Sequence, residues 1–261
     1  MTTRLPAALL AIVFLIPLLS WAGERVYFYS PESGINNFKV LKTAFDRYLS
    51  GYGSYEFQPF RQQEAFQDQV GTGAEGAVLL SGWHYRQIHR EYGLEALAVG
   101  TKNGETVNRR ILVGAVGKRG KPVAGVVATA FDPALAEEAL EKMLGSDRRK
   151  KVEALAVPKD IDALMSVGFG MADYALTTRA VFRETVAINA GLGTQLEEVA
   201  AGGEAFHLVL AVPAGKVPKA LVDALFDMPE TAEGKKNMGM LGLDGWHRID
   251  GTEKARLEGR Q

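Results

Sequence analysis

Short apolar runs alternate with helical segments along the sequence from Arg25 onward, and this pattern limits the possible folds more than any other feature. Residues 26–29, 76–80 and 110–116 are runs of apolar residues followed by turn-forming residues. Between the first two, apolar side chains in residues 38–48 recur every three or four positions, which is the spacing of a buried helix face. Strands that alternate with helices form sheets that the helices cover. The sequence therefore predicts an α/β protein.

The chain is long enough for two lobes, each with its own apolar core. It has 261 residues, of which 47% are hydrophobic, and such a length suits one large domain or two modest ones. A second α/β unit begins near residue 110, and the C-terminal part resumes the pattern of the first. We therefore predict that the second lobe is inserted in the first. The predicted ranges are 23–105 and 181–261 for the first lobe and 106–180 for the second, with crossings near Glu105–Arg110 and Thr177–Thr185, a strand at 185–189 and a short helix at 193–201.

The first 22 residues have the composition of a secretory signal peptide. Arg4 is followed by the uncharged apolar stretch 7–19 and then by Ser20-Trp21-Ala22, which places small residues where a signal peptidase requires them. The apolar stretch is shorter than the roughly 20 residues that span a bilayer. We predict cleavage after Ala22 and export to a bacterial periplasm. A retained anchor helix is the alternative.

Composition excludes several classes of function. The sequence has no cysteine, which rules out thiol catalysis, disulfide bonds, iron–sulfur clusters and thiolate zinc sites. With 30 Lys and Arg against 31 Asp and Glu, the formal net charge is −1, which gives no field for holding nucleic acid. We therefore expect no nucleic-acid partner.

The sequence also lacks the motifs of common enzymes and cofactor-binding domains. It contains no Gly-x-Ser-x-Gly elbow, no P-loop and no glycine-rich dinucleotide fingerprint after a strand. His84, His89 and Glu91 are separated by five and two residues, spacings that do not bring metal ligands onto one helix face. We predict no cofactor, no metal site and no catalytic residue.

Four segments, taken in order, resemble the phosphate/phosphite/phosphonate family of solute-binding proteins that serve ABC importers. They are the strand and proline loop 27–31, the strand and glycine–aromatic turn 76–85, the Gly-x-Ala-Asp stretch 170–176 and the tail 228–250. The resemblance covers nearly all of the chain that follows the leader. It implies the two-lobed, type 2 periplasmic binding fold with a ligand cleft between the lobes. It also implies hinge closure over the ligand and delivery to a membrane permease.

One segment departs from the family pattern. Phosphonate binders of the family carry a Ser/Thr-Ser-Gly cluster that opens a helix of the second lobe and holds the anion with amide and hydroxyl donors. This sequence has Ala128-Thr129-Ala130-Phe131-Asp132-Pro133 instead. Asp132 brings a negative charge, and Pro133 has no amide hydrogen to donate. We therefore predict that the ligand is not a simple phosphonate.

The first lobe offers two candidate ligand-binding segments, because ligands of such folds bind at the carboxyl ends of strands. One is the loop after the first strand, where Ser33 is either a ligand contact or the cap of the next helix. The other is the turn at residues 81–85, where Gly82 permits close backbone approach. Trp83 is either a wall of the cleft or a core residue. The candidate residues in these segments are Ser30, Glu32, Ser33, Ser81, Gly82, Trp83 and Tyr85.

The second lobe offers two further groups of candidates. Thr129 and Asp132 precede a helix, where Asp132 either faces the cleft or acts only as the helix N-cap. Tyr174, Thr177 and Thr178 lie on the predicted return crossing, where the threonines either line the cleft or face water as strand residues.

These observations predict a periplasmic solute-binding protein that captures a small molecule for an ABC importer. We expect a monomer whose partner is an ABC permease or a membrane sensor. Two alternatives stay open: a subunit that presents a ligand to a receptor kinase, and a secreted enzyme on the same fold.

Overall fold

A computed structural model of the chain describes residues 24–30, 35, 37–73 and 75–260. The predicted signal peptide and two of the predicted site residues, Glu32 and Ser33, lie outside the described residues. Within those ranges, no helix is both long and apolar enough to cross a membrane.

Lobe 1 is built on a six-stranded sheet with the strand order β11-β4-β10-β3-β1-β2. β1 pairs in parallel with both β2 and β3, while β10 runs antiparallel between β3 and β4, and β11 runs antiparallel to β4. The strands are β1 (Arg25–Tyr29), β2 (Glu56–Pro59), β3 (Gly76–Ser81), β4 (Leu94–Thr101), β10 (Leu208–Pro213) and β11 (Gly245–Arg248). The helices are α1 (Phe38–Ser50), α2 (Gln63–Gly71), α3 (Gly82–Ile88), α9 (Lys219–Phe226), α10 (Ala232–Met240) and α11 (Gly251–Leu257), with a 3₁₀ turn at Met228–Glu230.

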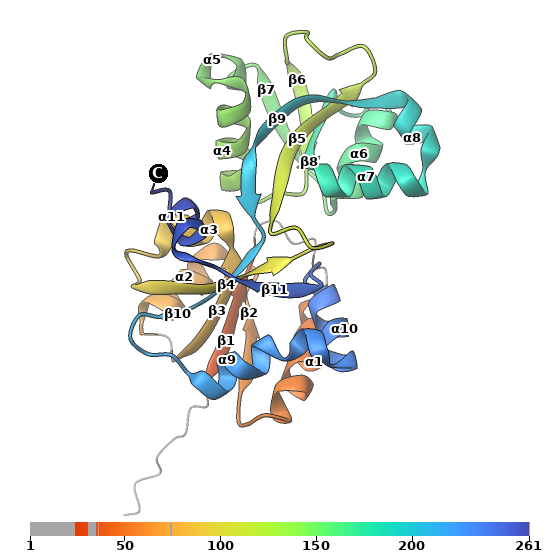
Figure 1. Ribbon diagram of the computed structural model, residues 1–261. Coiled ribbons are helices and arrows are strands. Elements are labelled where there is room, and N and C mark those ends of the chain that lie inside the picture. The colour runs from red at the N-terminus through yellow and green to blue at the C-terminus, as the bar shows by residue number, and fades with distance from the viewer. Residues whose placement is uncertain (1–23, 31–34, 36, 74, 261) are drawn as a thin grey trace, which may run out of the picture.

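Helices cover both faces of this sheet. Successive side chains of β1 point to opposite faces, and those on each face pack against a different helix. Phe28 packs on one face with Phe45 of α1, and Tyr29 packs on the other with Phe66 of α2. The sheet is therefore buried on both sides, and the carboxyl ends of β1 and β3 face lobe 2 (Figure 1).

Lobe 2 is built on a five-stranded sheet with the order β7-β6-β8-β5-β9. β6 is parallel to β7 and β8, and β5 is antiparallel to β8 and β9. The strands are β5 (Val107–Ala115), β6 (Gly125–Thr129), β7 (Val152–Ala156), β8 (Tyr174–Thr178) and β9 (Leu196–Phe206). The helices are α4 (Pro133–Leu144), α5 (Ser146–Arg149), α6 (Asp160–Gly168), α7 (Arg179–Ile188) and α8 (Ala190–Gln195).

The structure confirms the α/β fold with a second lobe inserted in the first. The chain leaves lobe 1 after β4, forms all of lobe 2 and re-enters lobe 1 as β10 (Figure 1). The outward crossing lies between Thr101 and Val107, close to its predicted place.

The return crossing lies at His207 and not at Thr177–Thr185, where the sequence had placed it. Residues 196–206 still pair with β5 in lobe 2, so the chain returns only after Phe206. This edge strand contains the pairs Glu197-Glu198 and Gly202-Gly203 and many half-exposed positions, all of which carry little strand signal. An edge strand pairs on one side only, so its outer side needs no apolar pattern.

The predicted strand at 185–189 is wrong, because this segment completes helix α7. The hydroxyl of Thr178 accepts a hydrogen bond from the amide of Val181 and caps the helix. Thr185 is the buried residue of α7, Val181 and Val186 are half-buried and Ile188 is exposed, so the β-branched run belongs to a surface helix and not to a buried strand. The predicted helix at 193–201 likewise begins as α8 but turns into β9 at Leu196.

Candidate functional site

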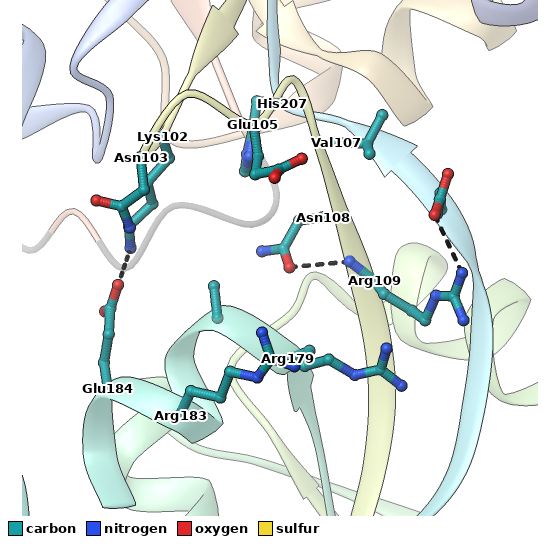
Figure 2. Close-up of a pocket in the computed structure, with 12 residues that line it drawn as sticks. Lys102, Asn103, Glu105, Val107, Asn108, Arg109, Arg179, Arg183, Glu184 and His207 are labelled. Carbon is teal, nitrogen blue, oxygen red and sulfur yellow. Dashed lines mark hydrogen bonds and ion pairs between the residues drawn. The ribbon is translucent and has the colours of Figure 1, made fainter. Parts of the chain in front are cut away.

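A cavity of about 480 Å³ lies beside the two crossing segments, and we call it the hinge-side cavity (Figure 2). The end of β4, the start of β5 and the first turns of α7 form its walls. Charged and amide side chains dominate the lining, which consists of Lys102, Asn103, Glu105, Val107, Asn108, Arg109, Arg179, Ala180, Arg183, Glu184, Glu204 and His207.

Ion pairs balance most of the charge in the hinge-side cavity. Lys102 of lobe 1 pairs with Glu184 of lobe 2 at 2.7 Å, so this pair joins the lobes. Arg109 pairs with Glu204 at 3.0 Å, and Arg179 pairs with Glu198 through two nitrogens. The cavity is therefore polar without being strongly charged, which suits a ligand with several hydrogen-bonding groups.

A second cavity of about 120 Å³, the inner cavity, lies between the two sheets. Lobe 1 contributes the ends of β1 and β3, and lobe 2 contributes the start of α6 and the start of α7. Lys102, Asn108 and His207 line both cavities, so the two adjoin. The other residues of the inner cavity are Ser30, Ser81, Asp160, Thr178, Val181, Leu208, Leu241, Gly242 and Leu243.

Three of the predicted site residues line the inner cavity, namely Ser30, Ser81 and Thr178. Ser81 and Thr178 also cap helices, since their hydroxyl oxygens accept hydrogen bonds from the amides of His84 and Val181. Their hydroxyl hydrogens can still be donated to a ligand. Thr177 is fully buried next to the cavity and donates to Asp160 at 2.7 Å, which fixes one oxygen of that lining carboxylate.

Two predicted residues lie inside the lobes instead. Tyr85 is fully buried in lobe 1, where its hydroxyl donates to the carbonyl of Leu94 and accepts from the amide of Ala96. Burial raises the pKa of Tyr85 above its ordinary value, with smaller contributions from nearby acids. Tyr174 packs in the core of lobe 2, with the ammonium of Lys118 at 4.4 Å from its ring centre.

Gly82 and Trp83 line neither the hinge-side cavity nor the inner cavity. They contact the end of β9 and helix α4 instead. A Cβ atom on Gly82 would lie 2.9 Å from the carbonyl oxygen of Phe206, so glycine permits β9 to approach. Trp83 is 4% exposed and packs among lobe 2 residues, and its Nε1 donates to Glu138 of α4 at 2.7 Å.

The side chains of Asp132 and Thr129 hydrogen-bond to backbone amides at the start of α4. Asp132 caps the helix by accepting a hydrogen bond from the amide of Ala134 at 2.9 Å. Thr129 is buried, and its hydroxyl accepts from the amide of Phe131. Tyr29 of lobe 1 hydrogen-bonds to Asp132, and burial together with this carboxylate raises the pKa of Tyr29. A carboxylate thus occupies the place where an anion would meet the α4 N-terminus.

Sequence reasoning missed most of the polar residues in the cavities, including Lys102, Asn108, Asp160, Arg183 and His207. No motif marks them, because they come from five separate places along the chain. Asn108 carried a usable signal, since it lies within the predicted outward crossing. His207 carried no such signal, because the predicted return crossing lies about 25 residues before the observed one.

No protein-family model and no curated protein matches the sequence. Solved structures do resemble the chain. A Xanthomonas citri protein bound to ATP has 13% identity and a TM-score of 0.65, and the match covers 91% of this chain and 94% of that one. A binding protein component of an ABC phosphonate transporter from Pseudomonas aeruginosa has 11% identity and a TM-score of 0.65, with 90% and 83% covered.

A third similar structure is PhnD1 from Prochlorococcus marinus in complex with methylphosphonate. It has 11% identity and a TM-score of 0.62, and the match covers 91% of this chain and 98% of that one. The chain has the two-lobed periplasmic binding protein fold. At these identities the likeness establishes the fold, and the ligand has to be argued from the residues of the site.

Proposed function

We propose that this protein is a periplasmic solute-binding protein that captures a small organic molecule between its lobes and delivers it to an ABC importer. The observation that carries the proposal is the inner cavity, which is lined by hydroxyls of Ser30 and Ser81 from lobe 1 and by Asn108, Asp160 and Thr178 from lobe 2. A solute that bridges these groups would bind both lobes at once. The predicted leader at residues 1–22 supports a periplasmic location.

The ligand in this proposal is not a simple phosphonate. The similar Prochlorococcus marinus protein binds methylphosphonate, but here Asp132 accepts the free amide at the start of α4 and Pro133 offers none. A phosphonate placed there would meet a carboxylate, and like charges at close range repel. The hydroxyl, amide and paired charged groups of the two cavities suit a polar organic solute that both donates and accepts hydrogen bonds.

The proposed role is binding without chemistry, followed by transfer to a membrane permease. One of the similar structures is a component of an ABC phosphonate transporter, which supports transport as the process served. Specific recognition of the closed, solute-loaded protein by a permease would complete the role.

A thermal-shift screen of the full chain tests the proposal. The panel contains amino acids, sugars, small carboxylates and sulfonates, together with inorganic phosphate and methylphosphonate. At least one organic solute is expected to raise the Tm, because a ligand that binds only the native state stabilises it. Phosphate and methylphosphonate are expected to leave the Tm unchanged.

Two variants locate the effect. Asn108→Ala removes an amide from both cavities and is expected to abolish the Tm increase caused by the active solute. Asn189→Ala, at the far end of α7, is the matched control and should keep it. A panel without any stabilising organic solute contradicts the proposed function, and strong stabilisation by methylphosphonate contradicts the proposed ligand class.

A further inference from the structure

Trp83 belongs to lobe 1 by sequence position and to the core of lobe 2 by packing. It sits on the first turn of α3, directly after β3 of the lobe 1 sheet. Its side chain is 4% exposed and joins a buried cluster whose other members all come from lobe 2. These include Leu112, Phe131 and Leu135. A lobe 1 indole is thus an integral part of the lobe 2 core.

Polar contacts around Glu138 reinforce this insertion. The indole Nε1 donates to the carboxylate of Glu138 at 2.7 Å, and the side-chain amide of Gln87 donates to the same oxygen at 3.4 Å. The guanidinium of Arg86 lies 3.6 Å from the other oxygen, and Lys142 also donates to it. We call these contacts, with Trp83, the α3–α4 interface. Three side chains of α3, those of Trp83, Arg86 and Gln87, therefore contact one residue of α4.

A second contact closes the same side of the cleft. Tyr29, which is 3% exposed at the end of β1, hydrogen-bonds to Asp132 at the start of α4. On the other side of the cleft, the lobes are joined by the partly exposed pair of Lys102 and Glu184 beside the hinge-side cavity. The buried side chains of Trp83 and Tyr29 therefore close the α4 side, whereas charged and amide side chains line the cavity on the α7 side (Figure 2).

We propose that Trp83 holds the two lobes together when no solute is bound. Separation of α3 from α4 would expose the indole to water and remove the hydrogen bond to Glu138, both of which are unfavourable. It follows, on the proposed function, that solute reaches the inner cavity from the α7 side, past Lys102 and Glu184.

Distance measurements between spin labels test the closure directly. The chain has no cysteine, so Arg90→Cys near the end of α3 and Lys150→Cys at the end of α5 place one label on each exposed side of the interface. Double electron–electron resonance on the solute-free protein is expected to give one narrow distance distribution. A broad distribution, or one centred well beyond the distance in the closed structure, overturns the proposal.

Removal of the indole supplies the second half of the test. In the labelled protein, Trp83→Ala is expected to lengthen and broaden the distance distribution, and added indole is expected to restore the short distance by refilling the space. Trp246→Ala is the matched control: Trp246 packs half-buried on the lobe 1 core, so its loss should lower the Tm and leave the distance unchanged. An unchanged distance in Trp83→Ala overturns the proposal.

Trp83→Phe covers the case in which Trp83→Ala does not fold. This variant keeps an aromatic ring and loses the hydrogen-bond donor to Glu138. A second population at a longer distance between the spin labels is therefore expected, and a distribution without that population counts against the proposal. The solute screen described above is independent of these distances. A solute-free protein that is open contradicts only the role of Trp83, whereas a failed screen contradicts only solute binding.

Discussion

The indole nitrogen of Trp83 lies 2.7 Å from a carboxylate oxygen of Glu138, and this hydrogen bond joins lobe 1 to lobe 2. Burial has the largest single effect and raises the pKa of Glu138, but the hydrogen bonds from Lys142 and Trp83 together with the charges of Lys142 and Arg86 lower it, so the net pKa lies below the ordinary value. Glu138 is therefore ionised at neutral pH and acts as an acceptor. A charged acceptor strengthens the bond to the indole.

Glu138→Ala is expected to destabilise the protein by about 1–3 kcal/mol, because it leaves a buried indole N–H without an acceptor. Urea unfolding at pH 7 measures the change. Glu141→Ala, one turn further along α4 at an exposed position, is the matched control and is expected to cost far less. Equal losses in the two variants would show that the indole hydrogen bond contributes nothing of its own.

Gly82→Ala is expected to destabilise the protein by about 1–3 kcal/mol, the usual cost of forcing an extra carbon into a packed site. The new Cβ atom would lie 2.9 Å from both the Cβ and the carbonyl oxygen of Phe206, at the point where β9 ends. Backbone atoms cannot move aside as a flexible side chain can. The free energy of unfolding from urea titration measures the effect.

Gly239→Ala is the control for this substitution. Gly239 is an exposed position within α10, and nothing lies within 4 Å of a Cβ atom there. Alanine favours the helix over glycine by up to about 1 kcal/mol, so the control should be neutral or stabilising. A neutral Gly82→Ala variant would mean that the crossing strand can shift away from α3 at no cost.

The fold could be predicted to the extent that it rests on local patterns. The runs at 26–29 and 76–80 are uniformly apolar because the parallel strands that they form are buried on both faces. Strand β9 could not be predicted in the same way. It pairs with β5 through backbone hydrogen bonds on one side, and such bonds do not depend on side-chain type, so its glycines and glutamates need no apolar pattern.

The site was harder to predict than the fold, because its residues meet only through tertiary structure. Ser81 and Thr178 were found from their positions at strand ends, and both line the inner cavity. Tyr85 shares the same turn, yet it points into lobe 1, where its hydroxyl hydrogen-bonds to the backbone of Leu94 and Ala96 on β4. The side chain of Trp83 crosses to lobe 2, which no pattern within lobe 1 could reveal.

Asp132→Ala is expected to destabilise the protein by about 1 kcal/mol through loss of the N-cap of α4. The variant also removes the hydrogen-bond partner of Tyr29 across the cleft. Asp132→Asn is the matched control, because asparagine caps helices about as well as aspartate. Urea unfolding should therefore separate the two variants. If both lose the same stability, the charge of Asp132 and not its capping oxygen is what matters.

His84 is a fully buried histidine beside Tyr29 and Phe66, with ring-centre distances of 5.2 Å and 5.4 Å. Its Nε2 lies 3.1 Å from the side-chain nitrogen of Gln67, and within the described residues its buried Nδ1 has no hydrogen-bond partner. Burial disfavours the charged ring and lowers the pKa of His84 from 6.5 to about 4. Folding therefore favours the neutral form.

The stability that depends on neutral His84 is complete above the unfolded pKa near 6.5 and is lost as the pH falls toward the folded pKa of about 4. A shift of this size corresponds to roughly 3 kcal/mol. Because carboxylates also titrate in this window, the measured quantity is the difference between wild type and His84→Gln in urea unfolding at pH 7.5 and pH 4.5. Wild type is expected to lose more stability between the two pH values than His84→Gln. A His84→Gln variant that loses as much stability as the wild type between the two pH values would show that His84 is not held neutral by the fold.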